Sequence, residues 1–225
     1  MARAAVPPSA GGTPAPAPWV QALRQSAQRL LLSPWRPWLQ TLLCLLPLVW
    51  LVAGVVLDTL GANPAEALIR STGDWTLRAL CLTLAVTPLR ISLGVPALAR
   101  VRRLFGLAAW FYASLHLLCY AAFDMGLDLG DIVRDTVKRP FILVGVTAWL
   151  LMLPLTLTSF NRAIKALGGK QWQRLHRVVY GVVLLGLLHF FWMRAGKNNF
   201  TEVAVYGLLI AALLGWRLQR AVRRG

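Results

Sequence analysis

Six long apolar runs, separated by short polar loops, limit the folds open to this chain more than any other feature of its sequence. A helix needs about 20 mostly apolar residues to cross a bilayer. Hydrophobic residues make up 57% of the 225 residues and charged residues only 14%, whereas roughly a quarter of a soluble domain is charged. We therefore predict an all-α polytopic membrane protein, a helix bundle with six transmembrane helices at 39–57, 75–93, 104–123, 141–160, 176–193 and 201–218.

The net charge of +16 is distributed unevenly between the two sides that six spans define. The N-terminal segment, the loops after the second and fourth spans and the C-terminal segment carry 17 of the 24 basic residues, and all eight acidic residues fall on the other side. Because cytoplasmic loops are enriched in Lys and Arg, both termini are predicted to be cytoplasmic. The basic residues form no stripe on one face, which argues against a soluble nucleic-acid-binding protein.

Three regions are predicted along the chain. Residues 1–37 form an N-terminal tail, disordered up to Pro18 because Ala, Pro and Gly there cannot bury a core, and compatible with an amphipathic surface helix at 19–32. Residues 38–218 form the six-helix domain, and residues 219–225 form a basic C-terminal tail. No cleavable signal peptide is evident.

Only three histidines occur, His116, His176 and His189, and each lies in or at a predicted span. Ionisable residues within a span are costly and usually face a functional interior, although a hydrogen bond between helices also satisfies a single histidine. His116 lies about 18 Å beyond the start of its span, and His189 lies about 20 Å beyond His176. Since both spans run outwards, the two imidazoles reach similar depth and could bind one heme iron.

His176 lies near the cytoplasmic interface, where no second histidine faces it. The residue 13 positions before His116 is Arg103, in the place where a partner for His176 is expected. On an ideal helix 13 residues turn about 140° away from a common face, so the two levels are not stacked on one ideal helical face. The inner level is predicted to have one histidine and one arginine where the outer level has two histidines.

Several short strings, in order along the loops, resemble a known family. Together with the six spans and the spacing of His176 and His189, they make residues 38–218 similar to the ferric-reductase-like transmembrane domain superfamily. Within it, the resemblance is to the MsrQ/YedZ family of heme-binding membrane subunits of the periplasmic protein-methionine-sulfoxide reductase system. The strings are Asn63-Pro64-Ala65-Glu66, Thr72-Gly73-Asp74-Trp75, Thr87-Pro88-Leu89-Arg90, Arg102-Arg103-Leu104-Phe105-Gly106, Lys138-Arg139-Pro140-Phe141, Thr158-Ser159 and Trp172-Gln173-Arg174-Leu175-His176-Arg177.

The resemblance implies a multi-pass b-type cytochrome of the bacterial inner membrane, with one or two hemes b and FMN as cofactors. It implies electron transfer from a cytoplasmic flavin reductase or the quinol pool to a periplasmic molybdopterin-containing subunit that repairs methionine sulfoxide in proteins. The chain would be an electron-transfer subunit and not the catalytic one. The family's heme-associated histidines match His116, His176 and His189, and Arg103 stands in place of a fourth. We expect two-histidine ligation at the outer site and a labile or single-histidine inner site.

Other expectations rest on position. Arg78 and Arg177 are predicted to pair with heme propionates, and the loop 124–139 is predicted to touch the periplasmic acceptor. No GxGxxG motif opens a βα unit, and only a short tail follows the sixth span, so we expect a separate electron donor. The basic residues between 162 and 177 could attract a flavin phosphate, but the rule that cytoplasmic loops are basic explains them equally well.

Two other classes of protein remain open from the residues alone. One is a heme-free proton-coupled transporter in which the histidines relay protons. The other is a structural membrane anchor for a periplasmic enzyme, in which heme is incidental. An absorption spectrum of the purified protein separates all three classes.

Overall fold

The computed structural model describes residues 17–195 and 200–223, and all regular structure within these ranges is helical. Six helical segments of the described chain are long and apolar enough to span a membrane, which confirms the predicted all-α fold with six spans. The disorder predicted up to Pro18 falls almost entirely on residues 1–16, which lie outside the described ranges. The helices are α1 (Pro18–Leu32), α2 (Arg36–Val56), α3 (Pro64–Leu93), η1 (Pro96–Arg100), α4 (Arg102–Cys119), η2 (Tyr120–Asp124), α5 (Leu129–Lys138), α6 (Pro140–Leu157), α7 (Asn161–Leu167), α8 (Gly169–His176), α9 (Val179–Ala195) and α10 (Thr201–Val222).

The second spanning helix, α3, begins at Pro64 and not at residue 75 as predicted. The Asn63 side chain caps it by accepting a hydrogen bond from the Glu66 backbone N–H at 3.1 Å. Proline is favoured in the first turn because its missing N–H is not needed there. The added turns are polar, so a prediction based on apolar runs misses them.

The fifth span is not the single helix predicted from His176 onwards, because Arg177 and Val178 form a turn between α8 and α9. The backbone N–H groups of both residues bond to carbonyls three residues back, which tightens the chain. The Trp172 indole N–H also donates to the Thr158 carbonyl at 2.9 Å, which fixes α8 to the end of α6. His176 therefore ends a short helix, and the ideal-helix rotation between it and His189 does not apply.

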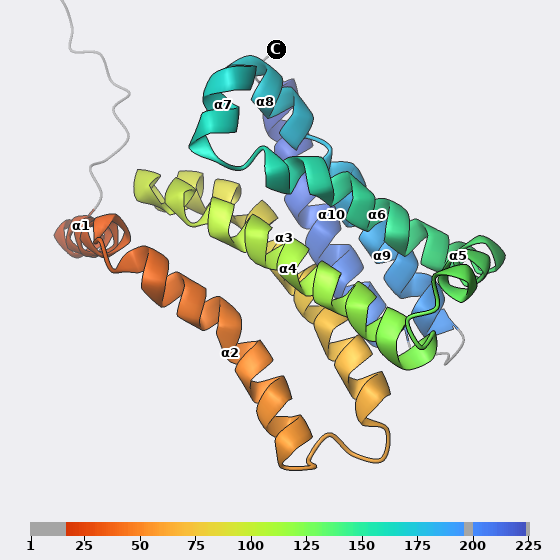
Figure 1. The fold of residues 1–225 in the computed structure, drawn as a ribbon. Helices are drawn as coiled ribbons and strands as arrows, with labels where there is room; N and C mark the ends of the chain where they lie inside the picture. The colour runs from red at the N-terminus through yellow and green to blue at the C-terminus, as the bar shows by residue number, and fades with distance from the viewer. Residues whose placement is uncertain (1–16, 196–199, 224–225) are drawn as a thin grey trace, which may run out of the picture.

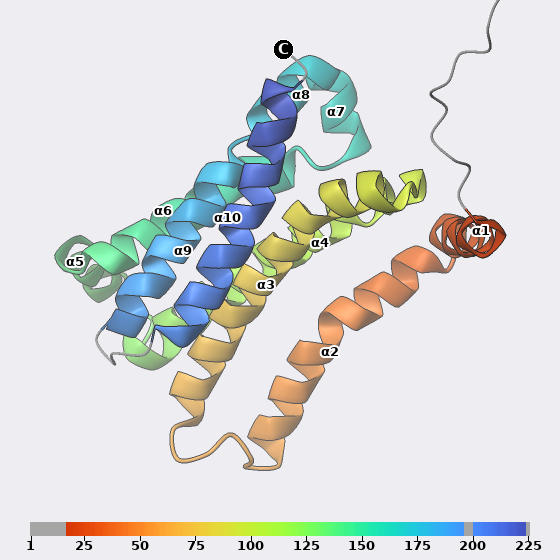
Figure 2. The same ribbon diagram turned by 180° about the vertical axis from the view of Figure 1, so that it is seen from behind.

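Two pairs of long helices form the core of the bundle (Figures 1 and 2). Helix α3 packs along α4, and α6 packs along α9, with α10 beside α3 and α9. Leu84, Ala109, Val183 and Ile210 are fully buried where these helices meet. Helix α2 stands further out, and its link to the core includes a 2.7 Å hydrogen bond from the Tyr112 hydroxyl to the Cys44 carbonyl.

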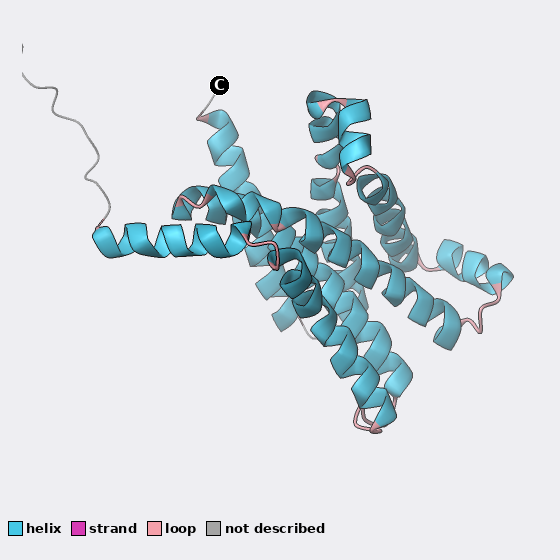
Figure 3. Cartoon of the chain, turned by 60° about the vertical axis from the view of Figure 1, so that its left-hand side comes forward, coloured by secondary structure: helices cyan, strands magenta, loops and turns pink. Residues whose placement is uncertain are grey.

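The polar connections gather at opposite ends of the bundle. Figures 1 and 2 show α7, α8 and the C-terminal end of α10 at one end, and α5 with the α2–α3 connection at the other. This arrangement agrees with the two charge populations of the sequence. Figure 3 shows α1, which follows the grey N-terminal trace, lying crosswise and projecting from the bundle. No residue of α1 is buried, and α1 covers the residues at 19–32 where a helix was expected, while its place on the membrane surface stays a prediction.

The sixth spanning helix continues past the predicted end at residue 218 to Val222. Two of its arginines contact neighbouring groups. The Arg217 guanidinium donates to the carbonyls of Leu213 and Leu84, and that of Arg220 lies over the Trp216 ring.

Candidate functional site

Two histidines from different helix pairs meet inside the bundle. His116 lies on α4 and His189 on α9, and their ring centroids are 6.0 Å apart with the ring planes inclined at 78°. Both imidazoles line one cavity of about 240 Å³, which we call the outer cavity because it contains the histidines of the predicted outer level. The two rings therefore lie together, in agreement with the similar depths expected from the sequence.

Each imidazole is held through one ring nitrogen. Nδ1 of His116 lies 2.8 Å from the Ile69 carbonyl oxygen on α3, and Nδ1 of His189 lies 2.7 Å from the Phe141 carbonyl oxygen on α6. A carbonyl oxygen only accepts, so Nδ1 carries the hydrogen and donates in both rings. Nε2 of each ring is then the unprotonated nitrogen, which is the form of imidazole that binds a metal.

The distance between the two rings fits a single metal ion between them. With a metal–nitrogen bond of about 2 Å and each nitrogen about 1 Å from its ring centre, two axial imidazoles place their centroids about 6 Å apart. Across the described ranges no group of three or more His, Cys, Asp or Glu side chains is placed to hold a bare metal ion. Heme iron needs only one or two axial ligands from the protein, so the donor set fits heme.

The cavity walls around the two imidazoles are largely apolar. Such a lining excludes water from a bound cofactor and leaves its orientation to a few polar groups. Two apolar side chains of the outer cavity, Leu80 and Met152, also line the second cavity described below, so they lie between the two cavities. Apolar residues of the outer cavity include Leu77, Leu80, Ala113, Trp149, Met152 and Val182.

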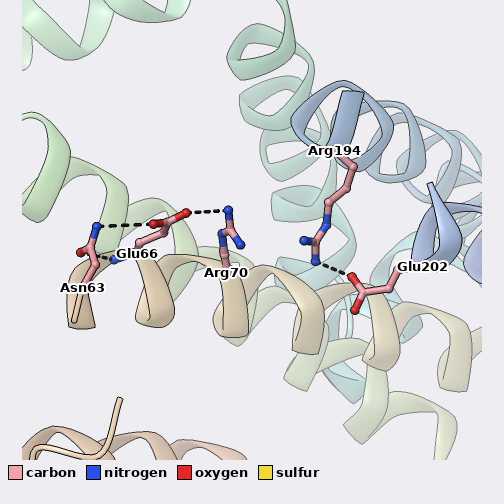
Figure 4. A network of polar contacts seen from close by, with 5 residues as sticks. All are labelled: Asn63, Glu66, Arg70, Arg194 and Glu202. Carbon is pink, nitrogen blue, oxygen red and sulfur yellow. Dashed lines mark hydrogen bonds and ion pairs between the residues drawn. The ribbon is translucent and has the colours of Figure 1, made fainter. Parts of the chain in front are cut away.

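Arginines line the outer edge of this cavity, and each is paired with a carboxylate. Arg70 on α3 lies 2.5 Å from Glu66, and Arg194 at the end of α9 donates to Glu202 on α10. Figure 4 shows Glu66 between Asn63 and Arg70, and Arg194 reaching across to Glu202. Asp74 and Asp124 also line this cavity, so its edge carries charges of both signs. A guanidinium there would bind a heme carboxylate by exchanging its present partner for it.

A third arginine of the outer edge, Arg139, connects α6 to α5 and η2. It donates to Asp135, which also accepts a 2.6 Å hydrogen bond from the Tyr120 hydroxyl. The hydrogen bonds from Arg139 hold the pKa of the Asp135 carboxyl below its usual value, and the same pairing raises the pKa of Arg139. The ionised pair fixes α5 beside the cavity.

His176 lines a second, larger cavity of about 720 Å³ on the side of α7 and α8. Its Nε2 lies 3.2 Å from the Thr158 hydroxyl, and the Trp172 ring stacks on it with the centroids 4.0 Å apart. No other histidine lines this cavity among the described residues. Although this cavity is the larger of the two, one histidine lines it, whereas two histidines line the other. The number of histidines, and not the volume, therefore favours the cavity of His116 and His189 as a heme site.

Arginines dominate the polar lining of the inner cavity. Arg103 is engaged, because it donates to the Asn161 side chain at 3.1 Å and its guanidinium lies 5.6 Å from the Phe160 ring centroid. Within the described ranges, the side chains of Arg90 and Arg102 donate no hydrogen bond to another residue, and the Arg102 guanidinium is repelled by those of Arg217 and Arg90. No described Asp or Glu lines this cavity, whose arginines are Arg36, Arg90, Arg100, Arg102 and Arg103.

Two arginines selected from the sequence lie elsewhere. The Arg78 side chain donates to the Tyr206 hydroxyl at 3.2 Å, and its guanidinium lies 4.6 Å from the Trp75 ring centroid. Arg177 is in the turn between α8 and α9. Neither residue is among those that line the two cavities, so the structure does not bring them together with the histidines.

Sequence reasoning missed four residues of this site, three of them on the helices that pack against those of the histidines and one, Arg194, at the end of α9 itself. Gly73 and Gly145 contact the two imidazoles, and Arg70 and Arg194 line the outer edge. A signal existed for Arg70, which follows Glu66 by four residues as in a helical ion pair. Nothing in the apolar run around Gly145 distinguishes it from the other glycines of the spans.

Comparisons with known proteins extend over most of the chain. The family model described as ferric reductase like transmembrane component matches residues 72–187. A protein-methionine-sulfoxide reductase heme-binding subunit MsrQ from Polaromonas naphthalenivorans (strain CJ2) is 61% identical over 191 residues, which are 85% of this chain and 87% of that protein. The subunit of the same name from Ralstonia nicotianae is 49% identical over 187 residues, 82% of this chain and 86% of the relative. One from Rhodospirillum rubrum is 46% identical over 181 residues, 80% of this chain and 86% of the relative. No solved structure matches the chain significantly.

Proposed function

This chain belongs to the family of protein-methionine-sulfoxide reductase heme-binding subunits named MsrQ, and on that premise we propose that it is the membrane cytochrome of such a system. It carries electrons across the bilayer to a partner that reduces methionine sulfoxide in proteins. His116 and His189 would hold a heme b in the outer cavity. The chain is the electron-transfer subunit, and the partner is the catalytic one.

One observation carries this proposal. Two imidazoles from separate helix pairs lie 6.0 Å apart, and each is oriented by a hydrogen bond from Nδ1 to a backbone carbonyl. Metal-binding histidines typically donate their second N–H in this way, which fixes the tautomer and raises the basicity of the binding nitrogen. A transporter or an anchor gives no reason for two histidines that are both held in the metal-binding form at this separation.

Bound heme supplies reversible one-electron chemistry, and the chain's residues set its surroundings. His116 and His189 would hold the iron, and the apolar lining would keep water away from it. Arg70 and Arg194 would bind the propionates at the outer edge by exchanging Glu66 and Glu202 for them, whereas sequence position favoured Arg78 and Arg177. Arg78 and Arg177 retain the role proposed for them only if they reach a propionate from outside the cavity lining.

The direction of transfer follows from the proposed orientation, in which both termini are cytoplasmic. The end of the bundle with α5 then faces the periplasm, and the loop 124–139 contacts a molybdopterin-containing reductase subunit. Electrons enter at the opposite end from a cytoplasmic flavin reductase or from quinol. The multi-pass character supports a location in the bacterial inner membrane.

The inner cavity is the proposed place for further cofactors. FMN would be held through its phosphate by Arg90 and Arg102, whose donors have no acceptor among the described residues. A second heme would have His176 as its one imidazole ligand, and only after Nε2 leaves the Thr158 hydroxyl, so it would be labile. Arg103 donates to the Asn161 side chain. It would supply positive charge in the inner cavity, and it provides no imidazole that could bind iron.

The absorption spectrum of the purified full-length protein in detergent tests the proposal. We expect the reduced b-type signal of a two-histidine heme to be lost in His116→Ala and in His189→Ala. His176→Ala should retain that signal and lose only the signal of a second heme, where one is bound. Loss of flavin per chain in Arg102→Gln, with the heme signal unchanged, would support the FMN site. A colourless preparation from heme-replete cells would favour the transporter, and heme that stays oxidised when donor is supplied would favour the anchor.

A further inference from the structure

The two imidazoles of the outer cavity rest on their neighbouring helices in the same way. On α3 the Ile69 carbonyl accepts from His116, and Gly73 follows four residues later. On α6 the Phe141 carbonyl accepts from His189, and Gly145 follows four residues later. Residues four apart on a helix lie on the same face, one turn from each other. Each imidazole therefore meets a carbonyl and a glycine on one face of its neighbouring helix.

Both glycines leave space that a side chain would fill. A Cβ atom on Gly145 would lie 2.9 Å from Nδ1 and 3.0 Å from Cε1 of His189. A Cβ atom on Gly73 would lie 3.2 Å from both Cε1 and Nδ1 of His116. Carbon atoms in proteins prefer separations of about 3.5–4.0 Å. Any residue other than glycine would push the ring away from its carbonyl at these two positions, and more strongly at Gly145.

Other helical glycines of the bundle do not have this role. Gly186 lines the same cavity from α9, yet a Cβ atom there would have nothing within 4 Å, and the same holds for Gly181 and Gly207. Glycine within a helix is unfavourable relative to alanine because it fixes more backbone freedom. At Gly73 and Gly145 the close contact with an imidazole gives a reason for that cost.

We propose that Gly73 and Gly145 are positioning residues for the axial histidines, each letting one imidazole lie close enough to the helix backbone to donate Nδ1–H to the carbonyl four residues earlier. This inference rests on the proposed function, because it takes both rings as ligands of heme iron. The hydrogen bond makes Nε2 a stronger donor to iron, which favours the ferric state and slows heme loss. The glycines thereby act on the iron through the histidines without touching it.

Alanine variants of the full-length protein test the inference by three measurements besides activity. These are the rate of heme transfer to excess apomyoglobin, the midpoint potential of the heme and the helical circular dichroism. We expect Gly145→Ala to speed heme loss about tenfold, in line with other changes to groups that orient metal ligands. Gly73→Ala should have a smaller effect in the same direction. Both variants should raise the midpoint potential while the helix content stays as in the wild type.

Gly181→Ala is the matched control, since it adds the same methyl group to α9, the helix of His189, at a position outside the cavity lining where a Cβ atom would have nothing within 4 Å. It should leave the rate of heme loss and the potential unchanged. If Gly145→Ala fails to accumulate, Gly73→Ala decides, because its contact is milder. The inference is overturned if the wild type shows a two-histidine heme and Gly73→Ala and Gly145→Ala behave like Gly181→Ala. A wild type without that heme would overturn the proposed function itself, and this inference with it.

Discussion

The imidazole planes of His116 and His189 are inclined at 78°, and each ring is held at that angle by its own helix pair. If iron binds between them without rotating the rings, the ferric heme has nearly perpendicular axial ligands. We predict an electron paramagnetic resonance signal of the strongly anisotropic low-spin type that such ligands give. A rhombic low-spin signal, typical of parallel imidazoles, would mean that the rings rotate when iron binds. His176→Ala should leave the signal unchanged.

At this scale the sequence points to the histidines and not to the groups that orient them. A histidine within an apolar span is rare enough to be noticed on its own. A backbone carbonyl is present at every position, so Ile69 and Phe141 are indistinguishable until the fold brings an imidazole to them. Gly73 and Gly145 are equally hard to recognise from the sequence, because their role depends on an imidazole ring more than 40 residues away.

The position of α5 depends partly on a single charged group, the carboxylate of Asp135. The Asp135 carboxylate accepts from Arg139 and from Tyr120, which joins α5 to α6 and η2. Replacing it as Asp135→Asn should lower stability by about 1 kcal/mol, since the pair is partly exposed. That loss corresponds to a fall of about 2–4 °C in the Tm of a chain of this size.

The effect of Asp135→Asn should depend on pH. Arg139 lowers the pKa of Asp135 in the folded protein, whereas an unfolded chain has an Asp pKa of about 3.9. The carboxylate therefore contributes fully above about pH 4, and its contribution disappears as the pH falls through the lower folded value. Thermal unfolding of both proteins between pH 7 and pH 3 should show the difference in Tm closing at the acid end. Asp131→Asn, which removes an exposed ion pair with Arg134, is the control, and an equal gap at every pH would contradict the prediction.

The bounds of the helices show which features the hydropathy of the sequence did not predict. It identified the apolar part of α3 but not its first turns, although Asn63, Pro64 and Glu66 form a recognisable helix start. It also missed the turn between α8 and α9, because Arg177 and Val178 include neither glycine nor proline. That turn accompanies contacts of Trp172 and His176 with Thr158, which only the folded bundle brings together.

For the whole molecule, the separation of charge along the bundle predicts which end faces the cytoplasm. In the sequence, all eight acidic residues fall on the side of the six spans that includes α5, and the loops and terminal segments of the other side carry most of the basic residues. We therefore expect a cysteine at Thr59, in the α2–α3 connection, to react with a membrane-impermeant maleimide in cells whose outer membrane is permeable. A cysteine at Gln173, on α8, should react only after the inner membrane is opened. Both positions are exposed and uncharged, so the count of basic residues stays the same.

The wild type controls this experiment, because its free cysteines Cys44, Cys81 and Cys119 are buried or half-buried within spanning helices and should stay unlabelled. The outcome also fixes the direction of electron flow. The cavity between His116 and His189 is edged by Arg70 and Arg194, which lie toward the end of the bundle that contains Glu66 and Glu202. Labelling at Thr59 from outside would place the two-histidine site on the periplasmic half, next to the acceptor. Labelling of Gln173 from outside would reverse the bundle and put that site beside the cytoplasmic donor, which would contradict the proposed route.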